Sequence, residues 1–141
     1  MTLFVDTSVW SLALRRDTPV SSPQARALED ALLGADVVVT TGMVLQELLQ
    51  GFSGPKARAQ IIERFAALPL LQPDREDHIA AAELRNICRR AGVQVGTVDA
   101  LLAQLCIRHE LVLLSTENDF ALAAKYCSLR IWSPTVRRGR K

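Results

Sequence analysis

Short apolar runs alternate with longer segments of helical periodicity along this chain, and that alternation constrains its fold more than any other feature. The runs expected to form strands are residues 3–5, 37–39, 70–71, 111–114 and 129–132. The segments expected to form helices are residues 8–16, 23–34, 41–51, 55–68, 74–91, 97–109 and 119–126. Strands that are apolar throughout and separated by helices are typical of a parallel sheet covered on both faces. We therefore predict a three-layer α/β/α fold with a central, mostly parallel sheet of four to five strands.

The length of 141 residues fits one domain with a substantial core. Nearly half of the residues are apolar (49%) but only 5% are aromatic, so the core must be largely aliphatic. No repeat or interdomain linker interrupts the pattern. We expect one domain over residues 1–134, followed by a basic tail over 135–141 that is either a solvated end or an arm that attracts phosphate.

Cysteine usage and the first residues indicate the compartment. Three cysteines are an odd number, they are far apart, and none forms a C-x-x-C pair, so we expect buried, reduced thiols and a cytoplasmic protein. Asp6 follows too early for the apolar core of a signal peptide. No apolar run approaches the roughly 18 residues that span a bilayer, so no membrane association is expected. His78 and His109 lack zinc-binding spacings.

Acidic residues follow two of the expected strands. Asp6 comes directly after the first strand, and Glu117 and Asp119 come shortly after the strand at 111–114. In an open parallel sheet, ligands bind beyond the carboxyl ends of the strands, near the point where strand order reverses. These carboxylates are therefore candidates for one shared site.

Two further acids stand beside apolar surface in expected helices. Glu47 borders the apolar positions of the helix at 41–51, and Asp99 lies early in a helix whose nearby residues are almost all apolar. An unpaired carboxylate is costly in such surroundings. Each acid also has an ordinary structural explanation. Asp6 could cap the next helix, Asp99 could favour a helix dipole, Glu47 could be solvated, and Glu117 and Asp119 could be loop or cap residues.

Convergence of these acids would require cations. Two unit charges about 4 Å apart interact by roughly 4 kcal/mol at an effective dielectric constant of about 20. Several carboxylates in one pocket would therefore repel each other or take up protons unless cations lay between them. A site of oxygen ligands without His or Cys suits Mg²⁺ or Mn²⁺, which serve phosphoryl chemistry by activating water.

The order of these motifs resembles the PIN-domain family, in particular its VapC-type ribonuclease toxins, over nearly the whole chain. The matching segments are Phe4-Val5-Asp6-Thr7-Ser8-Val9-Trp10, Val44-Leu45-Gln46-Glu47-Leu48, Asp99-Ala100-Leu101-Leu102-Ala103 and Leu113-Leu114-Ser115-Thr116-Glu117-Asn118-Asp119-Phe120. The last resembles the family pattern Thr-x-Asp-x-Asp-Phe. Each motif is weakly specific, and the four together in order are strongly specific.

The resemblance implies roles for individual residues. Asp6, Glu47 and Asp99 match three acidic metal ligands. Glu117 stands where the family usually has Asp, and Asp119 matches the acid before Phe, so either is a candidate fourth ligand. The catalytic set implied is Asp6, Glu47, Asp99 and Asp119, with Glu117 added for metal binding. Ser115 stands in for an orienting Thr, and Thr7 and Ser8 match small hydroxyl residues that equally suit a helix start.

The resemblance also implies an activity and partners. The activity is Mg²⁺- or Mn²⁺-dependent endoribonuclease cleavage of RNA by metal-activated water. The partners are structured RNA as substrate, a cognate antitoxin protein, and a second copy of the chain, giving a homodimer and a heterotetramer or larger assembly with the antitoxin.

Three other interpretations remain. A phosphatase or hydrolase with an aspartyl nucleophile usually has a second acid two residues after the first, where this chain has Ser8. A receiver-type signalling domain would have adjacent acids near the first strand and a clear partner lysine. A catalytically silent PIN-like module that only binds RNA or a partner is the remaining alternative, which Glu117 in place of Asp leaves open.

Overall fold

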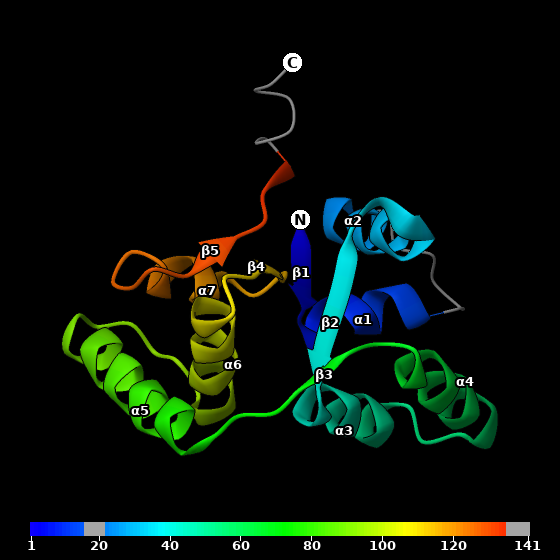
Figure 1. Cartoon of the computed structure of the whole chain (residues 1–141), viewed down its shortest axis with the longest axis horizontal. Coiled ribbons are helices and arrows are strands. Elements are labelled where there is room, and N and C mark those ends of the chain that lie inside the picture. Colours follow the sequence, from blue (N-terminus) through cyan, green and yellow to red (C-terminus); the bar gives the residue numbers. More distant parts are fainter. Residues whose placement is uncertain (16–21, 135–141) are drawn as a thin grey trace.

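The chain forms a five-stranded sheet in which every pairing is parallel (Figure 1). A computed structural model describes residues 1–15 and 22–134. The strands, in chain order, are β1 (Thr2–Val5), β2 (Val37–Thr41), β3 (Leu70–Leu71), β4 (Val112–Leu114) and β5 (Arg130–Ile131). They lie in the order β3-β2-β1-β4-β5. The predicted α/β/α fold is confirmed, and the sheet has the larger of the two strand numbers expected.

Helices connect the strands at the positions that periodicity predicts. They are α1 (Thr7–Leu14), α2 (Pro23–Asp30), α3 (Gly42–Gly51), α4 (Pro55–Ala66), α5 (Arg75–Arg90), α6 (Thr97–Arg108) and α7 (Asn118–Ala123). A π-helical turn, η1 (Ala31–Ala35), continues α2. Gly34, within this turn, has a φ of 109°, which suits a residue without a Cβ.

Two of the predicted helix starts and ends are wrong in detail. Thr97, which by residue type is predicted to cap the helix that starts there, is instead the first residue of α6, and Gly96 occupies the cap position without a side chain to accept a hydrogen bond. The last helix begins at Asn118 and ends at Ala123, short of the predicted residue 126. The predicted end of the first helix near Asp17 and the basic tail at 135–141 lie outside the described residues.

The strand order places a reversal between β1 and β4. From β1 the chain proceeds to β2 and β3 on one side, then returns to β4 and β5 on the other side of β1. Helices α1 and α2 contact each other, as do α3 and α4, whereas α5 packs chiefly on α6. In Figure 1, α5 and α6 lie to one side of β1 and β2, and α1, α2 and α4 lie to the other. The carboxyl ends of β1 and β4 thus meet at the switch point where open α/β sheets bind ligands.

The core is aliphatic, as the composition predicts. Phe4, Val5, Leu113 and Leu114 on the two central strands have no exposed surface. The indole of Trp10 on α1 is 1% exposed and packs on Phe65 of α4 with ring centroids 4.8 Å apart. Burial of this apolar surface is the main favourable contribution to folding.

A buried carboxylate fastens α5 to α6. Asp77 is 0% exposed, and its two oxygens accept hydrogen bonds of 2.7 Å each from Nε and Nη2 of Arg108. Asp77 also forms a reciprocal capping box with Asp74 at the start of α5. Burial pushes the pKa of Asp77 upward, but the hydrogen bonds from Arg108, the Asp74 backbone and Gln104 lower it to about 2. Sequence patterns did not identify this pair, which joins residues 31 positions apart.

The thiols are reduced and mostly buried. Cys88 and Cys106 are buried, Cys127 is half-buried, and all three are free. Burial, together with the nearby charge of Asp6, raises the pKa of Cys106 to about 12, so this thiol stays protonated. Among the described residues, no helix is long and apolar enough to cross a bilayer.

Candidate active site

The register of β1 and β4 brings Asp6 beside Ser115. Val5 pairs with Leu114, so the next residues along the two strands are adjacent. The Asp6 amide continues the ladder by donating to the Leu114 carbonyl at 2.9 Å. The Ser115 hydroxyl donates to Oδ2 of Asp6 at 3.0 Å. Both side chains are buried, with Asp6 5% exposed.

A second hydroxyl holds the same carboxylate oxygen. The Ser8 hydroxyl donates to Oδ2 of Asp6 at 2.8 Å and accepts a 3.2 Å hydrogen bond from the Thr116 amide. In the same manner, the Ser115 hydroxyl accepts a 2.9 Å hydrogen bond from the Glu117 amide. The loop after β4 is therefore tied to Asp6 through two hydroxyl groups.

The first turn of α1 also reaches α3. The Thr7 hydroxyl donates to Oε1 of Glu47 at 2.5 Å, although the two residues are 40 positions apart. Helix α3 begins where it does because the Thr41 hydroxyl accepts from the Val44 amide and caps the first turn. Glu47 is exposed, and its carboxylate stands on the same side of the structure as Thr7 and Asp6.

Asp99 shows that the five acids share one electrostatic environment. It lies in the first turn of α6 and is half-buried. Burial, and then the negative charges of the other four acids, raise the pKa of Asp99 from 3.8 to about 6. Those four are Asp6, Glu47, Glu117 and Asp119. Carboxylates that directly follow β1, lie on α3 and lie after β4 are thus close enough to act on the Asp99 carboxylate of α6.

Glu117 and Asp119 form the outer side of this group. Both are exposed, at the N-terminal end of α7, and neither makes a side-chain cap hydrogen bond there. Both contribute to the raised pKa of Asp99, with Glu117 the larger contributor of the two.

The side chains that meet here are oxygen donors without a balancing cation. Within residues 1–15 and 22–134, no ion pair involves any of the five acids. In that same part of the chain, no three acids, cysteines or histidines stand close enough to form a ready-made metal-binding group. The donor chemistry, carboxylates with hydroxyls and no nearby thiolate or imidazole ligand, fits Mg²⁺ or Mn²⁺. The acids would have to draw closer together to bind such an ion.

The structure corrects one expectation about the first acid. Asp6 occupies the N-cap position of α1, but its side chain makes no cap hydrogen bond. Its oxygens face Ser8 and Ser115 instead. The sequence left Ser8 open between a family-matching hydroxyl near the first acid and a helix-start residue, and the structure shows that it contacts the Asp6 carboxylate. A hydroxyl two residues after an acid that ends a strand was the available signal.

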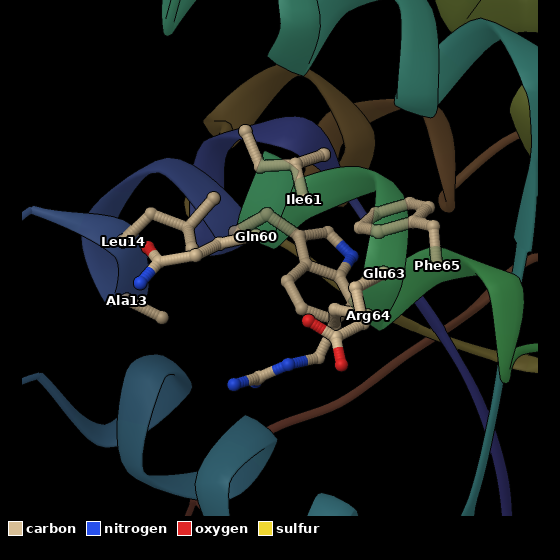
Figure 2. A pocket seen from close by; sticks show the side chains of 8 residues that line it. Ala13, Leu14, Gln60, Ile61, Glu63, Arg64 and Phe65 are labelled. Atoms are coloured by element: carbon tan, nitrogen blue, oxygen red, sulfur yellow. The ribbon is translucent and has the colours of Figure 1, made fainter. Parts of the chain in front are cut away.

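A cleft of about 500 Å³ lies elsewhere, between α1 and α4 (Figure 2). Its walls are lined by Trp10, Ala13, Leu14, Gln60, Ile61, Glu63, Arg64 and Phe65. None of the five acids is among them. The cleft is therefore separate from the carboxylate site.

Comparison with known proteins gives a consistent result. The PIN domain profile matches residues 3–126. The chain is 27% identical over 132 residues to Ribonuclease VapC11 of Mycobacterium tuberculosis and, to the same extent, to a VapC ribonuclease of Mycobacterium bovis. In both cases the match covers 91% of this chain and 96% of the relative.

Solved structures share the fold at low sequence identity. The chain superposes on a chain of the VapBC-1 structure from nontypeable Haemophilus influenzae with a TM-score of 0.72 at 17% identity, covering 96% of this chain and 99% of that one. For VapBC2 of Rickettsia felis, bound to a DNA fragment from its promoter, the TM-score is 0.71 at 19% identity, with 94% and 98% covered. For VapC20 of Mycobacterium tuberculosis, described as a toxin that cleaves the sarcin–ricin loop, it is 0.66 at 20% identity, with 86% and 94% covered.

Proposed function

Since this chain belongs to the PIN domain family, we propose that it is a metal-dependent endoribonuclease and the toxin of a toxin–antitoxin pair. The names of its relatives support the ribonuclease assignment, and solved structures of similar fold that are described as toxins support the toxin assignment. The observation that carries the site is the raised pKa of Asp99, caused by burial and by four other carboxylates. A bound cation would stabilise the ionised form of these acids, because its positive charge offsets the repulsion among the carboxylates.

We assign the metal to the carboxylates around Asp99. Asp6, Asp99 and Asp119 would hold Mg²⁺ or Mn²⁺, with Glu117 as a further ligand. When bound, such an ion supplies activation of water and neutralisation of charge on a phosphodiester.

The remaining polar residues would orient these carboxylates. Ser115 directs its proton to Oδ2 of Asp6 and thereby fixes the rotation of that carboxylate. Thr7 holds one oxygen of Glu47, which leaves the other oxygen to accept a proton or hydrogen bond from an attacking water. Glu47 either completes the acidic cluster or orients that water.

The substrate class follows from the exposed position of the site. Glu47, Glu117 and Asp119 are exposed, so the acids open to solvent at the edge of the sheet. Proteins recognise particular RNA segments mainly in single-stranded loops and bulges, whose unstacked bases can be contacted individually. We therefore propose structured RNA with exposed loops as the substrate.

The decisive experiment measures cleavage of structured RNA by the purified protein, freed of any partner. Activity is expected only with Mg²⁺ or Mn²⁺ and is expected to be lost on adding a chelator. Asp6→Asn and Asp99→Asn should each lower kcat/KM by at least about 100-fold, because each removes a charge from the metal site.

A control and two outcomes complete the test. Glu83→Gln removes an exposed acid from α5, away from the five acids, and should leave activity unchanged. Full activity in both Asp variants would overturn the assignment. Binding of RNA by the wild-type protein with no cleavage under any metal would favour the silent binding module instead.

We further propose that the chain acts with protein partners. Solved structures of similar fold are toxin–antitoxin complexes, several of them bound to DNA. By analogy, a cognate antitoxin would block the acidic site, commonly with an arginine set against the carboxylates. A homodimer would assemble with it into a heterotetramer or larger complex. Addition of the antitoxin should suppress RNA cleavage at a one-to-one ratio.

A further inference from the structure

The loop over residues 115–117, which ends at Glu117 and leads into α7 with Asp119 in its first turn, is joined to Asp6 by two parallel chains of hydrogen bonds. In one, the Thr116 amide donates to the Ser8 hydroxyl, which donates to Oδ2 of Asp6. In the other, the Glu117 amide donates to the Ser115 hydroxyl, which donates to the same oxygen. Each hydroxyl both accepts and donates, which a serine side chain can do.

This arrangement fixes the direction of both hydroxyl protons. The oxygen of each serine accepts from a backbone amide, so its own proton is left to point at the carboxylate. Two donors at 2.8 and 3.0 Å fill the lone-pair directions of Oδ2. No described residue donates to Oδ1 of Asp6, which is therefore the oxygen left to bind a ligand.

The two chains of hydrogen bonds, one through Ser115 and one through Ser8, connect different parts of the structure. The Ser115 hydroxyl accepts from the Glu117 amide, which is two positions further along the same segment. This hydrogen bond therefore fixes the local turn after β4. Ser8 lies on α1, and the Thr116 amide is 108 positions away in sequence, so this hydrogen bond joins the backbone of the loop directly to a side chain of α1. The first turn of α1 thus controls where the loop and its two acids stand relative to Asp6.

From these contacts we infer that Ser8 is a positioning residue of the acidic site. It couples the loop over residues 115–117 to Asp6 and so sets the distance of Glu117 and Asp119 from the first carboxylate. Ser8 acts through Asp6 and the Thr116 amide and does not itself touch metal or substrate. The inference rests on the proposed function where it concerns metal, and on the hydrogen bonds alone where it concerns the loop.

The first part of the test needs no metal. Amide hydrogen exchange is measured by NMR in wild type, Ser8→Ala, Ser8→Thr and Ser115→Ala. Loss of one hydrogen bond should speed exchange at the Thr116 amide about fivefold in Ser8→Ala. Ser8→Thr keeps a hydroxyl and should restore the wild-type rate. Ser115→Ala should instead speed exchange at the Glu117 amide. Unchanged exchange at Thr116 in Ser8→Ala would overturn the inference.

The second part measures Mn²⁺ binding by calorimetry. Removal of a group that orients a metal ligand typically weakens metal affinity by about 10- to 100-fold, so Ser8→Ala should lose affinity in that range and Ser8→Thr should recover it. A folded Ser8→Ala protein that binds Mn²⁺ within about twofold of wild type would overturn the positioning role. If wild-type protein bound no Mn²⁺, the proposed function would fail, whereas the exchange data would still decide whether Ser8 holds the loop.

Discussion

At the scale of single residues, the properties of a carboxylate here depend on what surrounds it. Asp77 and Asp99 are both in first turns of helices, where an acid is ordinarily favourable. Asp77 faces Arg108, and its pKa falls to about 2. Asp99 is desolvated and faces four acids, and its pKa rises to about 6. The first arrangement stabilises the fold, and the second stores repulsion that a cation can relieve.

The raised pKa of Asp99 predicts how metal binding depends on pH. Between about pH 4 and pH 6, Asp99 is protonated in the folded protein and ionised in the unfolded chain. Its raised pKa therefore contributes to the free energy of unfolding fully below about pH 4, and this contribution is lost as the pH rises through 6. A cation must displace that proton. Mn²⁺ affinity should therefore fall by about tenfold for each pH unit below 6 and level off above it.

Calorimetric titrations with Mn²⁺ from pH 5 to pH 8 would measure this dependence. Asp99→Asn, which cannot ionise, should bind weakly throughout and lose the change of slope near pH 6. Equal wild-type affinities at pH 5 and pH 7 would contradict the prediction.

At the scale of secondary-structure elements, α5 and α6 end in the same motif with different residues. After α5, the Val93 amide donates to the Cys88 carbonyl and the Gly92 amide to the Arg89 carbonyl. After α6, in the same pattern, the Leu111 amide donates to the Cys106 carbonyl and the Glu110 amide donates to the Ile107 carbonyl. This is the Schellman arrangement, which requires a left-handed residue at its centre. The motif uses glycine at Gly92, with φ 84°, and a glutamate at Glu110, with φ 54°.

The contrast predicts a stabilising substitution. A residue with a Cβ is strained in the left-handed region, so Glu110→Gly should raise the free energy of unfolding by about 1 kcal/mol. The Glu110 carbonyl, which accepts from Arg130, is backbone and survives the change. Urea denaturation measures the effect.

Gly92→Ala serves as the matched control for that substitution. A Cβ at Gly92 would meet no atom within 4 Å, so its cost is that of the backbone conformation alone. We expect it to lower the free energy of unfolding by about 1 kcal/mol. A Glu110→Gly protein less stable than wild type would show that the glutamate side chain makes a contribution larger than the strain.

At the scale of the whole molecule, a buried carboxylate adds to the packing that joins the two helices in the half of the fold that carries Asp99. Asp77 and Arg108 join α5 to α6, and α6 presents Asp99 to the site. The lowered pKa of Asp77 means that its contribution to stability is present above about pH 4 and lost as pH falls toward 2. A shift from 3.8 to about 2 corresponds to about 2 kcal/mol.

This contribution predicts part of the acid sensitivity of the protein. Urea denaturation at pH 7 and pH 3 should show a smaller loss of stability on acidification in Asp77→Asn than in wild type, because the variant has already lost the ion pair. Glu83→Gln should lose as much as wild type. An Asp77→Asn protein as stable as wild type at pH 7 would contradict the stabilising role of the pair.

The sequence alone determined the order of the elements, the parallel sheet and the placement of Asp6 and Ser115 at strand ends. Hydrophobic periodicity and helix-ending residues are local signals, and a parallel sheet brings its carboxyl ends to one edge whatever the details. The grouping of Asp6, Glu47, Asp99, Glu117 and Asp119 was predicted because motifs at these positions resemble those of a known family. In the structure the other four acids are close enough to act on the Asp99 carboxylate. Their roles in metal binding remain a prediction.

Only the tertiary structure decided which side chains touch. The hydrogen bonds from Ser8 to the Asp6 carboxylate and from the Thr116 amide to Ser8 depend on how β4 is aligned with β1, and the burial of Asp77 depends on how α5 packs on α6. Asp6 and Thr97 could each have capped a helix by local rules, and neither does so. These contacts join residues far apart in the chain, so their geometry is set by register and packing, and no local pattern of residues records it.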